Sequence, residues 1–364
     1  FLEANHLSRE WKWRVVEPDD DKLLNEVIRQ MDSFFHRGPE MLFSSYFQIL
    51  ERSKTGPGSS LQASGQSFYA KLGSSPKLTT TSVALYTLYR AYVALFPTWE
   101  EGESLRASQT ESGVAIADYS KMVFVPKNAN TDRASCVEPS LNMFMQLGLE
   151  SILRDRLKEL WNVDLETQPE LNRILARVGS RGGDFATLDL SSASDLISYE
   201  LCRKTLPRYV FDTLSELRVG KTLIEDFGLK VDLGMMSTMG NGFTFPLMTI
   251  ILGCIVRACY TLKGIPIKDN PRVGDAGFVP GNWAVFGDDI IVCREAHDYV
   301  VYALDRFGLK VNSLKSFNTG QFRESCGHDY FRGHDVRGVY LKRLTSRQDV
   351  AIAVNLLNDW SFRT

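Results

Sequence analysis

The feature that most constrains this chain is a pair of adjacent aspartates set between two apolar runs. Residues 285–292 read VFGDDIIV in one-letter code, with Asp288 and Asp289 at the centre. Two neighbouring carboxylates repel each other unless a cation or a proton compensates their charge. The glycine before them permits a sharp turn. The stretch therefore predicts a β-hairpin whose tip carries metal ligands, and a simply solvated turn is the alternative.

A third carboxylate lies about a hundred residues upstream. Residues 184–195 read DFATLDLSSASD, in which Phe185 to Leu190 predicts a strand. Asp189 then stands at the carboxyl end of that strand, where open sheets place their ligands. Asp195 falls on the following turn or at a helix start, within reach of the same site. A helix N-cap is the alternative role for Asp195.

These carboxylates indicate a site for a hard divalent cation. Oxygen ligands suit Mg²⁺ or Mn²⁺, and Mg²⁺ commonly bridges to substrate phosphates. Two such ions roughly 3.5–4 Å apart can activate an attacking hydroxyl and stabilise a leaving oxygen. Asp189 and Asp288 are the minimal set for this chemistry, with Asp289 as a supporting ligand. The pattern predicts phosphoryl transfer.

Two further segments have the composition of phosphate- and base-binding loops. Residues 121–133 alternate basic and small polar residues, and Pro126 disfavours a helix there. Lys127 and Arg133 could lie along phosphate oxygens, although solvated loop charges are the alternative. Residues 237–246 place two glycines around an asparagine before an apolar run, which lets the backbone approach a ligand closely.

Read in order, these segments resemble the motifs of viral RNA-dependent RNA polymerases. Residues 121–133 resemble motif F, residues 189–195 motif A, residues 237–245 motif B and residues 287–289 motif C. Residues 322–333 resemble a stretch of phage replicases in particular. The chain is therefore similar to the replicase catalytic (beta) subunit of the single-stranded RNA bacteriophages, the Qβ-like levivirus group.

The resemblance implies roles for individual residues. Asp189 and Asp288 would bind two catalytic Mg²⁺ ions, with Mn²⁺ possible, and Asp289 would assist. Asp195 would help to recognise the ribose hydroxyl of the incoming nucleotide. Many polymerases of this class have an asparagine four residues after the motif B threonine, where this chain has Met248, so the partner of Asp195 is left open.

Further nucleotide-binding roles follow from the same resemblance. Lys127 and Arg133 would contact the triphosphate, and Gly240 and Asn241 would support the template and the nucleotide base. Lys315, shortly after the metal hairpin, would match the motif D lysine proposed as a general acid toward pyrophosphate.

The implied fold is an α+β right-hand polymerase with fingers, a ferredoxin-like palm built on an antiparallel sheet, and a partial thumb. Residues 1–183 are expected to form the fingers, including the basic NTP-binding loop 121–133. Residues 184–335 would form the palm, with a finger insertion at about 201–235. Residues 336–364 would begin a truncated thumb, because the resemblance implies a replicase that extends further in both directions.

Composition narrows the class of partner and the compartment. The chain of 364 residues has 42 basic and 44 acidic residues, which counts against a tight non-specific RNA binder but not against a local basic channel. Six cysteines without paired spacing predict reduced thiols. The apolar run Phe243 to Val256 has 14 residues, fewer than the roughly 20 that span a bilayer, so we expect a buried helix and no membrane.

The leading functional prediction is template-directed RNA synthesis from ribonucleoside triphosphates, replicating a phage RNA genome in the cytoplasm of the bacterial host. The resemblance implies host translation elongation factors Tu and Ts and a ribosomal protein as partners, beside template and product RNA. One alternative is a reverse transcriptase-like polymerase, because Phe286 to Asp289 also fits its aromatic-x-Asp-Asp hairpin. The other is a non-catalytic RNA-binding palm fragment.

Overall fold

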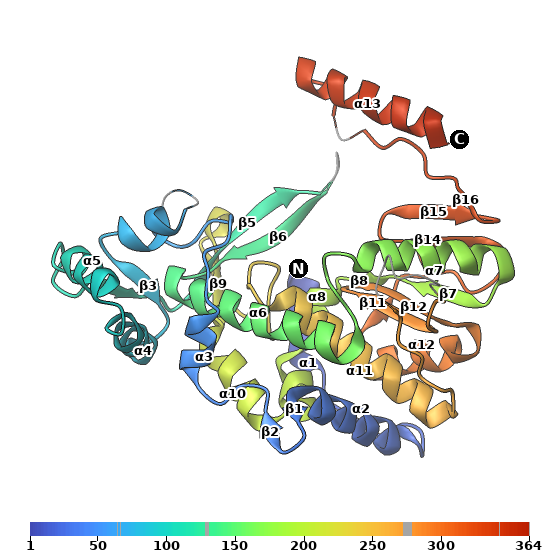
Figure 1. Ribbon diagram of the computed structural model, residues 1–364, viewed down its shortest axis with the longest axis horizontal. Coiled ribbons are helices and arrows are strands. Elements are labelled where there is room, and N and C mark those ends of the chain that lie inside the picture. Colours follow the sequence, from blue (N-terminus) through green and yellow to red (C-terminus); the bar gives the residue numbers. More distant parts are fainter. Residues whose placement is uncertain (64, 66, 128–130, 272–278, 342, 364) are drawn as a thin grey trace. The chain divides into compact units, whose positions relative to one another are not determined.

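The computed structural model describes residues 1–364 except 64, 66, 128–130, 272–278, 342 and 364 (Figure 1). The chain divides into two compact units, which are described separately here. Unit 1 comprises residues 1–123, 134–160 and 192–251, and unit 2 comprises residues 124–133, 161–191 and 252–364.

Unit 1 is mainly helical. Its helices are α1 (Leu2–Glu10), α2 (Asp20–Phe35), α3 (Tyr46–Glu51), α4 (Val83–Val93), α5 (Pro97–Ala107), nearly all of α6 (Ser140–Trp161), α8 (Ala193–Leu196), α9 (Tyr199–Thr205), α10 (Arg208–Leu217) and the first part of α11 (Thr244–Lys263), with a π-helical turn at Tyr69–Gly73 and a 3-10 turn at Glu225–Phe227. The apolar positions of α2 recur at helical spacing, and Leu23, Val27 and Met31 are fully buried.

The largest sheet with strands in unit 1 has the order β10-β9-β5-β6. Its strands are β5 (Ser120–Pro126), β6 (Asp132–Val137), β9 (Lys221–Ile224) and β10 (Leu229–Asp232), and two small pairs join β1 (His36–Arg37) to β2 (Glu40–Met41) and β3 (Leu78–Thr80) to β4 (Val114–Ile116). The basic segment 121–133, expected to be a loop, is therefore mostly a two-stranded ribbon (Figure 1). Pro126 is tolerated because it ends its strand and needs no N–H there.

Unit 2 contains a sheet with the order β11-β12-β7, all antiparallel. Its helices are α7 (Gln168–Gly182), the end of α11, α12 (His297–Arg306) and α13 (Arg347–Arg363), with a 3-10 turn at Arg294–Ala296, and its strands are β7 (Phe185–Leu188), β8 (Leu190–Ser191), β11 (Trp283–Phe286), β12 (Asp289–Cys293), β13 (Lys310–Val311), β14 (Phe322–Ser325), β15 (His328–Phe331) and β16 (His334–Asp335). Strand β8 pairs with β13, and β14, β15 and β16 form a third sheet.

Helix α7 packs against β7, β14 and β15 of unit 2. The approach to β7 is close, since a Cβ on Gly179 would lie 2.9 Å from the Cβ of Phe185. One core cluster fills this layer and consists of Leu171, Leu175, Ala176, Phe185, Ala284, Ile291 and Tyr330. Because β7 is buried along its whole length, its apolar residues fix its register, and Asp189 follows directly where the strand ends.

A buried arginine joins β14 to the start of β7. Arg323 is 0% exposed, and its guanidinium donates to the carbonyl oxygens of Phe185 at 2.6 Å and of Phe322 at 2.6 Å. It also donates to the carbonyls of Gly320 and Thr319. Burial lowers the pKa of Arg323, and the ring of carbonyl acceptors compensates the cost of burying the group.

Helix α11 is longer than the apolar run in the sequence, because residues beyond Val256 continue it to Lys263. Its 20 residues are long and apolar enough to cross a membrane by length and composition, but 78% of the apolar window is buried. That burial is typical of a core helix, as expected. The six cysteines are all free thiols.

Candidate active site

The two adjacent aspartates do lie at a hairpin. Strands β11 and β12 pair so that Phe286 is opposite Asp289, which leaves Gly287 and Asp288 as the two turn residues. Gly287 has φ +57°, and a positive φ at the first central residue is the pattern of a type II′ hairpin turn. Glycine therefore permits the turn, Asp288 stands at its tip, and Asp289 is the first residue of β12.

Asp189 emerges next to this hairpin. Leu188 of β7 pairs with Ile290 of β12, so the next residues outward in the same antiparallel register are Asp189 and Asp289. Asn312 orients Asp189 at both ends: its side-chain amide donates to Oδ2 at 3.0 Å, and its backbone N–H donates to the carbonyl at 2.8 Å. The hydroxyl of Ser316 accepts from the Asp189 N–H at 3.1 Å.

The three carboxylates influence one another electrostatically. Burial raises the pKa of Asp288, and the charges of Asp289 and Asp189 raise it further. Burial also raises the pKa of Asp189, which Lys315 and Asn312 counteract and the charge of Asp289 reinforces. Half-buried carboxylates that repel one another are stabilised when a cation enters between them.

Asp289 has a second set of contacts. Its Oδ1 accepts from the N–H of Cys326 at 2.9 Å and from the hydroxyl of Ser325 at 3.1 Å. The amide of buried Asn172 on α7 lies 3.3 Å from the same hydroxyl and 3.4 Å from the Asp289 carbonyl. One oxygen of Asp289 thus holds the tip of the β14–β15 hairpin.

Among the described residues, no group of three or more His, Cys, Asp or Glu side chains converges closely enough to hold a metal ion. The donor set consequently does not make an all-protein cage. It fits Mg²⁺, because this ion is usually held by one or two carboxylates and completes its shell with water and substrate phosphates. Asp189 and Asp288 could supply those two carboxylates, and their role as ligands stays a prediction. The role of Asp289 as a third ligand stays a prediction.

The predicted cations of unit 2 lie near the carboxylates. Lys127 and Arg133 are exposed on the β5–β6 ribbon, and their charges lower the pKa values of Asp189 and Asp288 respectively, against the larger effect of burial. Lys315 follows β13, with its Nζ 3.9 Å from the carboxylate of Glu324. Positive charge is therefore available where a triphosphate would add negative charge.

Several residues of this region escaped prediction from the sequence: Asn172, Asn312, Ser316, Glu324 and Ser325. Glu324 is a further carboxylate whose pKa is raised by burial and by the charges of Asp329, Asp189 and Asp289, while Lys315 lowers it. No spacing pattern in the sequence points to these residues, because their contacts are with other elements of the fold. Most of these contacts join positions more than 30 residues apart. The run FRESCG at 322–327 was the one available signal for Glu324 and Ser325.

Asp195, Gly240 and Asn241 belong to unit 1. Asp195 lies inside the four-residue helix α8, whose N-cap is Ser192, so the N-cap alternative for Asp195 is wrong. Burial raises its pKa, and its carbonyl accepts from Ser8 at 2.7 Å. No hydrogen bond or pKa effect between Asp195 and Met248 is found among the described residues.

Residues 237–243, called the glycine loop below, lie directly on β6. A Cβ on Gly240 would fall 1.6 Å from the carbonyl oxygen of Cys136, so only glycine fits there. Asn241 closes the loop on itself: its Oδ1 accepts from the N–H of Thr238 at 2.8 Å and from the Thr238 hydroxyl at 3.0 Å. The close backbone approach at Gly240 is thus to the protein's own strand, and an approach to a ligand stays a prediction.

Comparisons with known proteins identify the family. The family model described as "RNA replicase, beta-chain" matches residues 41–364. The chain belongs to this family. It is 39% identical over 269 residues to the RNA-directed RNA polymerase subunit beta of Escherichia virus Qbeta, covering 71% of this chain and 42% of that protein. It is 40% identical over 237 residues to the RNA-directed RNA polymerase beta chain of Enterobacteria phage fr, covering 65% of this chain and 40% of that protein.

The fold is that of viral RNA-dependent RNA polymerases, as predicted. The crystal structure of the RNA-dependent RNA polymerase of a human picobirnavirus matches with a TM-score of 0.53 at 12% identity, covering 95% of this chain and 66% of that one. An insertion-loop deletion mutant of the same polymerase also matches, with a TM-score of 0.53 and 98% of this chain covered. The curated relatives are longer, and this replicase-family chain spans about two fifths of their length.

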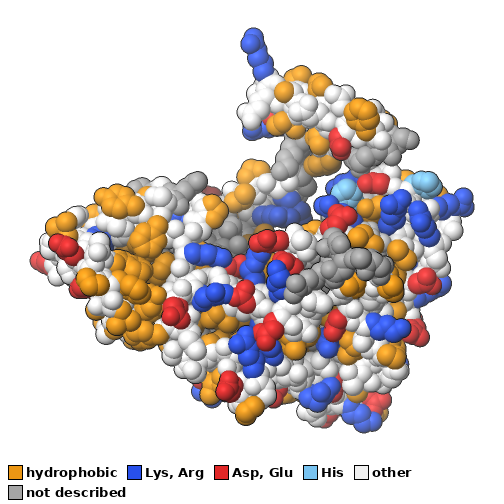
Figure 2. Space-filling model, viewed as in Figure 1, with side chains coloured by type: hydrophobic (Ala, Val, Ile, Leu, Met, Phe, Trp, Pro, Cys, Tyr) orange, Lys and Arg blue, Asp and Glu red, His pale blue; other side chains and the backbone are white. Residues whose placement is uncertain are grey.

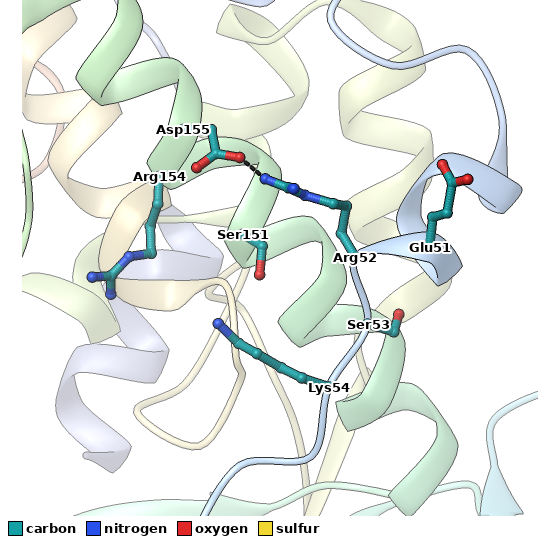
Figure 3. Close-up of a pocket in the computed structure, with 7 residues that line it drawn as sticks. All are labelled: Glu51, Arg52, Ser53, Lys54, Ser151, Arg154 and Asp155. Carbon is teal, nitrogen blue, oxygen red and sulfur yellow. Dashed lines mark ion pairs between the residues drawn. The ribbon is translucent and has the colours of Figure 1, made fainter.

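A polar pocket in unit 1 of this replicase-family chain is a separate feature (Figure 3). Its volume is about 380 Å³, and it is lined by Glu51, Arg52, Ser53, Lys54, Ser151, Arg154 and Asp155. Two of its basic residues form ion pairs: Arg52 bonds Asp155 (Figure 3), and the Lys54 Nζ lies 2.9 Å from a Glu150 oxygen. None of the predicted site residues lines it.

Positive and negative side chains are interspersed on the face drawn in Figure 2, which matches the balanced composition of the chain. Apolar side chains gather over α4 and α5, where Val83, Leu95 and Leu105 are more than half exposed. This face therefore offers no broad surface of a single charge to the RNA backbone. Near Asp189 and Asp288 the positive charge comes from single residues, Lys127, Arg133 and Lys315.

Proposed function

We propose that this chain is the catalytic region of an RNA-directed RNA polymerase that copies an RNA template by two-metal phosphoryl transfer. The observation that carries the proposal is the antiparallel register of β7 and β12, which sets Asp189 beside the Asp288–Asp289 turn. Membership of the replicase family supports it, since the relatives are named RNA-directed RNA polymerases. The raised pKa values of Asp189 and Asp288 agree with a site that is stabilised by divalent cations.

The carboxylates of Asp189 and Asp288 would hold Mg²⁺, which when bound supplies charge neutralisation and activates the attacking hydroxyl. Asn312 fixes the orientation of Asp189 through two hydrogen bonds. Lys127 and Arg133 would bind the triphosphate, in which the arginine fork suits paired phosphate oxygens. Lys315 would stand near the leaving pyrophosphate as a proton donor.

The residues of unit 1 would serve recognition. Asp195 would accept a hydrogen bond from the ribose hydroxyl, and Gly240 and Asn241 would support the template and the nucleotide base. The natural setting of this activity would be replication of a phage RNA genome in the cytoplasm of a bacterial host. Elongation factors Tu and Ts and a ribosomal protein would be its partners there.

The test is nucleotide incorporation on a short RNA template with Mg²⁺ or Mn²⁺, with the host factors present and absent. We expect ribonucleotides to be incorporated by the wild type and not by Asp288→Asn. A preference for deoxynucleotides would instead support the reverse transcriptase alternative. RNA binding that needs no metal, is unchanged in Asp189→Asn and comes with no incorporation would support the non-catalytic alternative.

A further inference from the structure

Unit 1 contains a buried carboxyl group that none of the roles above uses. Glu138 lies between β6 and α6 and is 0% exposed. Its carbonyl accepts from the Leu61 N–H at 2.9 Å, and its Oε2 accepts from the side-chain amide of Gln146 at 3.1 Å. No ion pair to Glu138 is found among the described residues, although Arg218 is near enough to lower its pKa. A buried carboxyl group with so little compensation is costly.

Gln146 connects this carboxyl group to the glycine loop. Its side-chain oxygen accepts from the backbone N–H of Gly242 at 3.0 Å. Its side-chain amide also donates to the carbonyl of Leu217 at 2.8 Å. Gln146 is itself 0% exposed. A continuous buried path of hydrogen bonds therefore runs from Glu138 through Gln146 to the backbone of the loop.

Asn241 offers a second connection. Its side-chain nitrogen is buried and has no hydrogen-bond partner among the described residues, and the same holds for Oε1 of Glu138. The Asn241 amide is nevertheless close enough to lower the pKa of Glu138. A buried donor and a buried acceptor, each otherwise unsatisfied, thus lie near each other where the loop passes the carboxyl group.

The polar groups around Glu138 favour its ionised form and so act against the effect of burial. Gln146, Asn241 and the backbone of Val219 all lower the pKa of Glu138 by presenting hydrogen-bond donors, and Arg218 adds positive charge. A carboxylate can accept from such donors, as it does from Gln146, whereas a protonated carboxyl group would place an O–H against N–H groups. The ionised form is consequently the one that best holds the loop.

We propose that Glu138 and Gln146 are positioning residues for RNA synthesis: the buried carboxylate and amide hold the glycine loop in the conformation in which Gly240 and Asn241 meet the template and nucleotide. The inference rests on the polymerase function proposed above. In this proposal the connection between β6 and α6 affects the reaction through the glycine loop and does not contact the substrate.

Burial raises the pKa of Glu138 to about 7. Besides Arg218, Cys136 on β6 faces it, and burial raises the pKa of that thiol too, with the Glu138 charge contributing. Because the pKa of Glu138 is higher in the folded than in the unfolded chain, its contribution to stability is complete below the unfolded pKa and is lost as the pH rises through about 7. Ionisation therefore orders the loop and at the same time lowers stability.

Because ionisation of Glu138 should order the loop but lower stability, activity and stability can distinguish a positioning role from a merely structural one. Glu138→Gln keeps the shape of the side chain and removes the ionisation. Its stability above about pH 7 should equal or exceed that of the wild type, because no charge is then buried. Its polymerase activity there should be lower, because the side-chain NH₂ of glutamine is an additional donor facing other donors.

The experiment measures kcat and KM for nucleotide incorporation, with thermal unfolding, between about pH 6 and pH 8.5. For Glu138→Gln we expect kcat/KM at least about tenfold below wild type at the alkaline end, a difference that shrinks toward acid pH, and an unfolding midpoint that is not lowered. Gln146→Leu should lose a similar factor, and the double variant little more than either one. The control is Glu111→Gln, an exposed glutamate of the same unit.

A Glu138→Gln variant with the wild-type pH profile would overturn the inference. So would a parallel fall of kcat/KM and unfolding midpoint at every pH, and so would an additive loss in the double variant. If Glu138→Gln does not fold, Gln146→Leu is tested instead, with its effects on KM and on kcat measured separately. A fully active Gln146→Leu variant would refute the link between this pair and the loop. An inactive wild type would refute the polymerase function instead.

Discussion

Two regions of this molecule bury carboxyl groups, and they do so in opposite surroundings. At the ends of β7 and β12, burial and the charge of Asp289 raise the pKa values of both Asp189 and Asp288, although Lys315 and Asn312 act against burial at Asp189. In unit 1, Glu138 faces N–H donors and a guanidinium, which act against burial. The first arrangement favours an added cation, and the second contains donors of the protein itself that partly offset burial.

The comparison teaches that a raised pKa does not by itself identify a metal ligand. In both regions burial is the largest cause of the shift, and the neighbours distinguish the roles. Asp289, next to Asp288 in the same hairpin, also has partners within the protein. Its Oδ1 accepts hydrogen bonds from Ser325 and Cys326. The experiments below test these assignments.

The largest effect is expected for Asp288→Asn. It removes the charge at the tip of the β11–β12 turn, and we expect nucleotide incorporation to fall by about a thousandfold or more. Thermal stability should not fall, because the change relieves repulsion with Asp189 and Asp289. Asp305→Asn, at an exposed aspartate of α12, is the control. A Mg²⁺-dependent rate close to wild type in Asp288→Asn would remove the metal site from this turn.

Gly240→Ala should have the next largest effect. The added methyl group would meet the Cys136 carbonyl, which forces the loop away from β6 and should cost about 1–3 kcal/mol of unfolding free energy. We expect incorporation to drop by roughly a hundredfold, beyond what the loss of stability explains. Gly220→Ala is the matched control, because a Cβ there meets no atom within 4 Å. Equal behaviour of the two variants would contradict a constrained loop.

Two substitutions of Asp289 should separate its role as a hydrogen-bond acceptor from the role of its charge. Asp289→Ala leaves the Ser325 hydroxyl and the Cys326 N–H without their acceptor, which should cost about 1–3 kcal/mol of stability. Asp289→Asn retains an oxygen acceptor, so it should fold normally and lose only about tenfold in rate. Thermal unfolding and incorporation assays measure both variants. If Asp289→Asn is as inactive as Asp288→Asn, then Asp289 acts mainly through its charge, as a metal ligand would.

The smallest effect is expected for Lys315→Met. Burial raises the pKa of Asp189 and Lys315 counteracts it, so removing the lysine should raise that pKa further. Because only the ionised carboxylate binds a cation, the acid limb of the pH–rate profile should move to higher pH, with a loss of a few fold on the acid side. Lys310→Met is the control on neighbouring β13. An effect confined to alkaline pH would instead support proton donation by Lys315.

The sequence predicted the hairpin, the strand before Asp189 and the core helices, because these depend on local alternation of apolar residues and on one glycine. It did not predict the ribbon at 121–133, where Pro126 and the small residues after it have the composition of a loop. Asn312 and Ser316 were missed because their contact with Asp189 joins positions more than 120 residues apart. Glu138, just before a proline and a helix, is indistinguishable in sequence from an exposed glutamate.

Strand β14 shows how little freedom one short segment can have. Arg323 and Ser325 point to one side, toward carbonyl acceptors and Asp289, whereas Glu324 between them points toward Lys315. Because successive side chains of a strand alternate between its two faces, deleting a single residue before β14 would exchange the two sets. Glu324 would then stand where Arg323 now meets the carbonyl oxygens, and Ser325 would stand where Glu324 now faces Lys315. The neighbouring carboxylates therefore depend on the register of β14 more than on any one of its side chains.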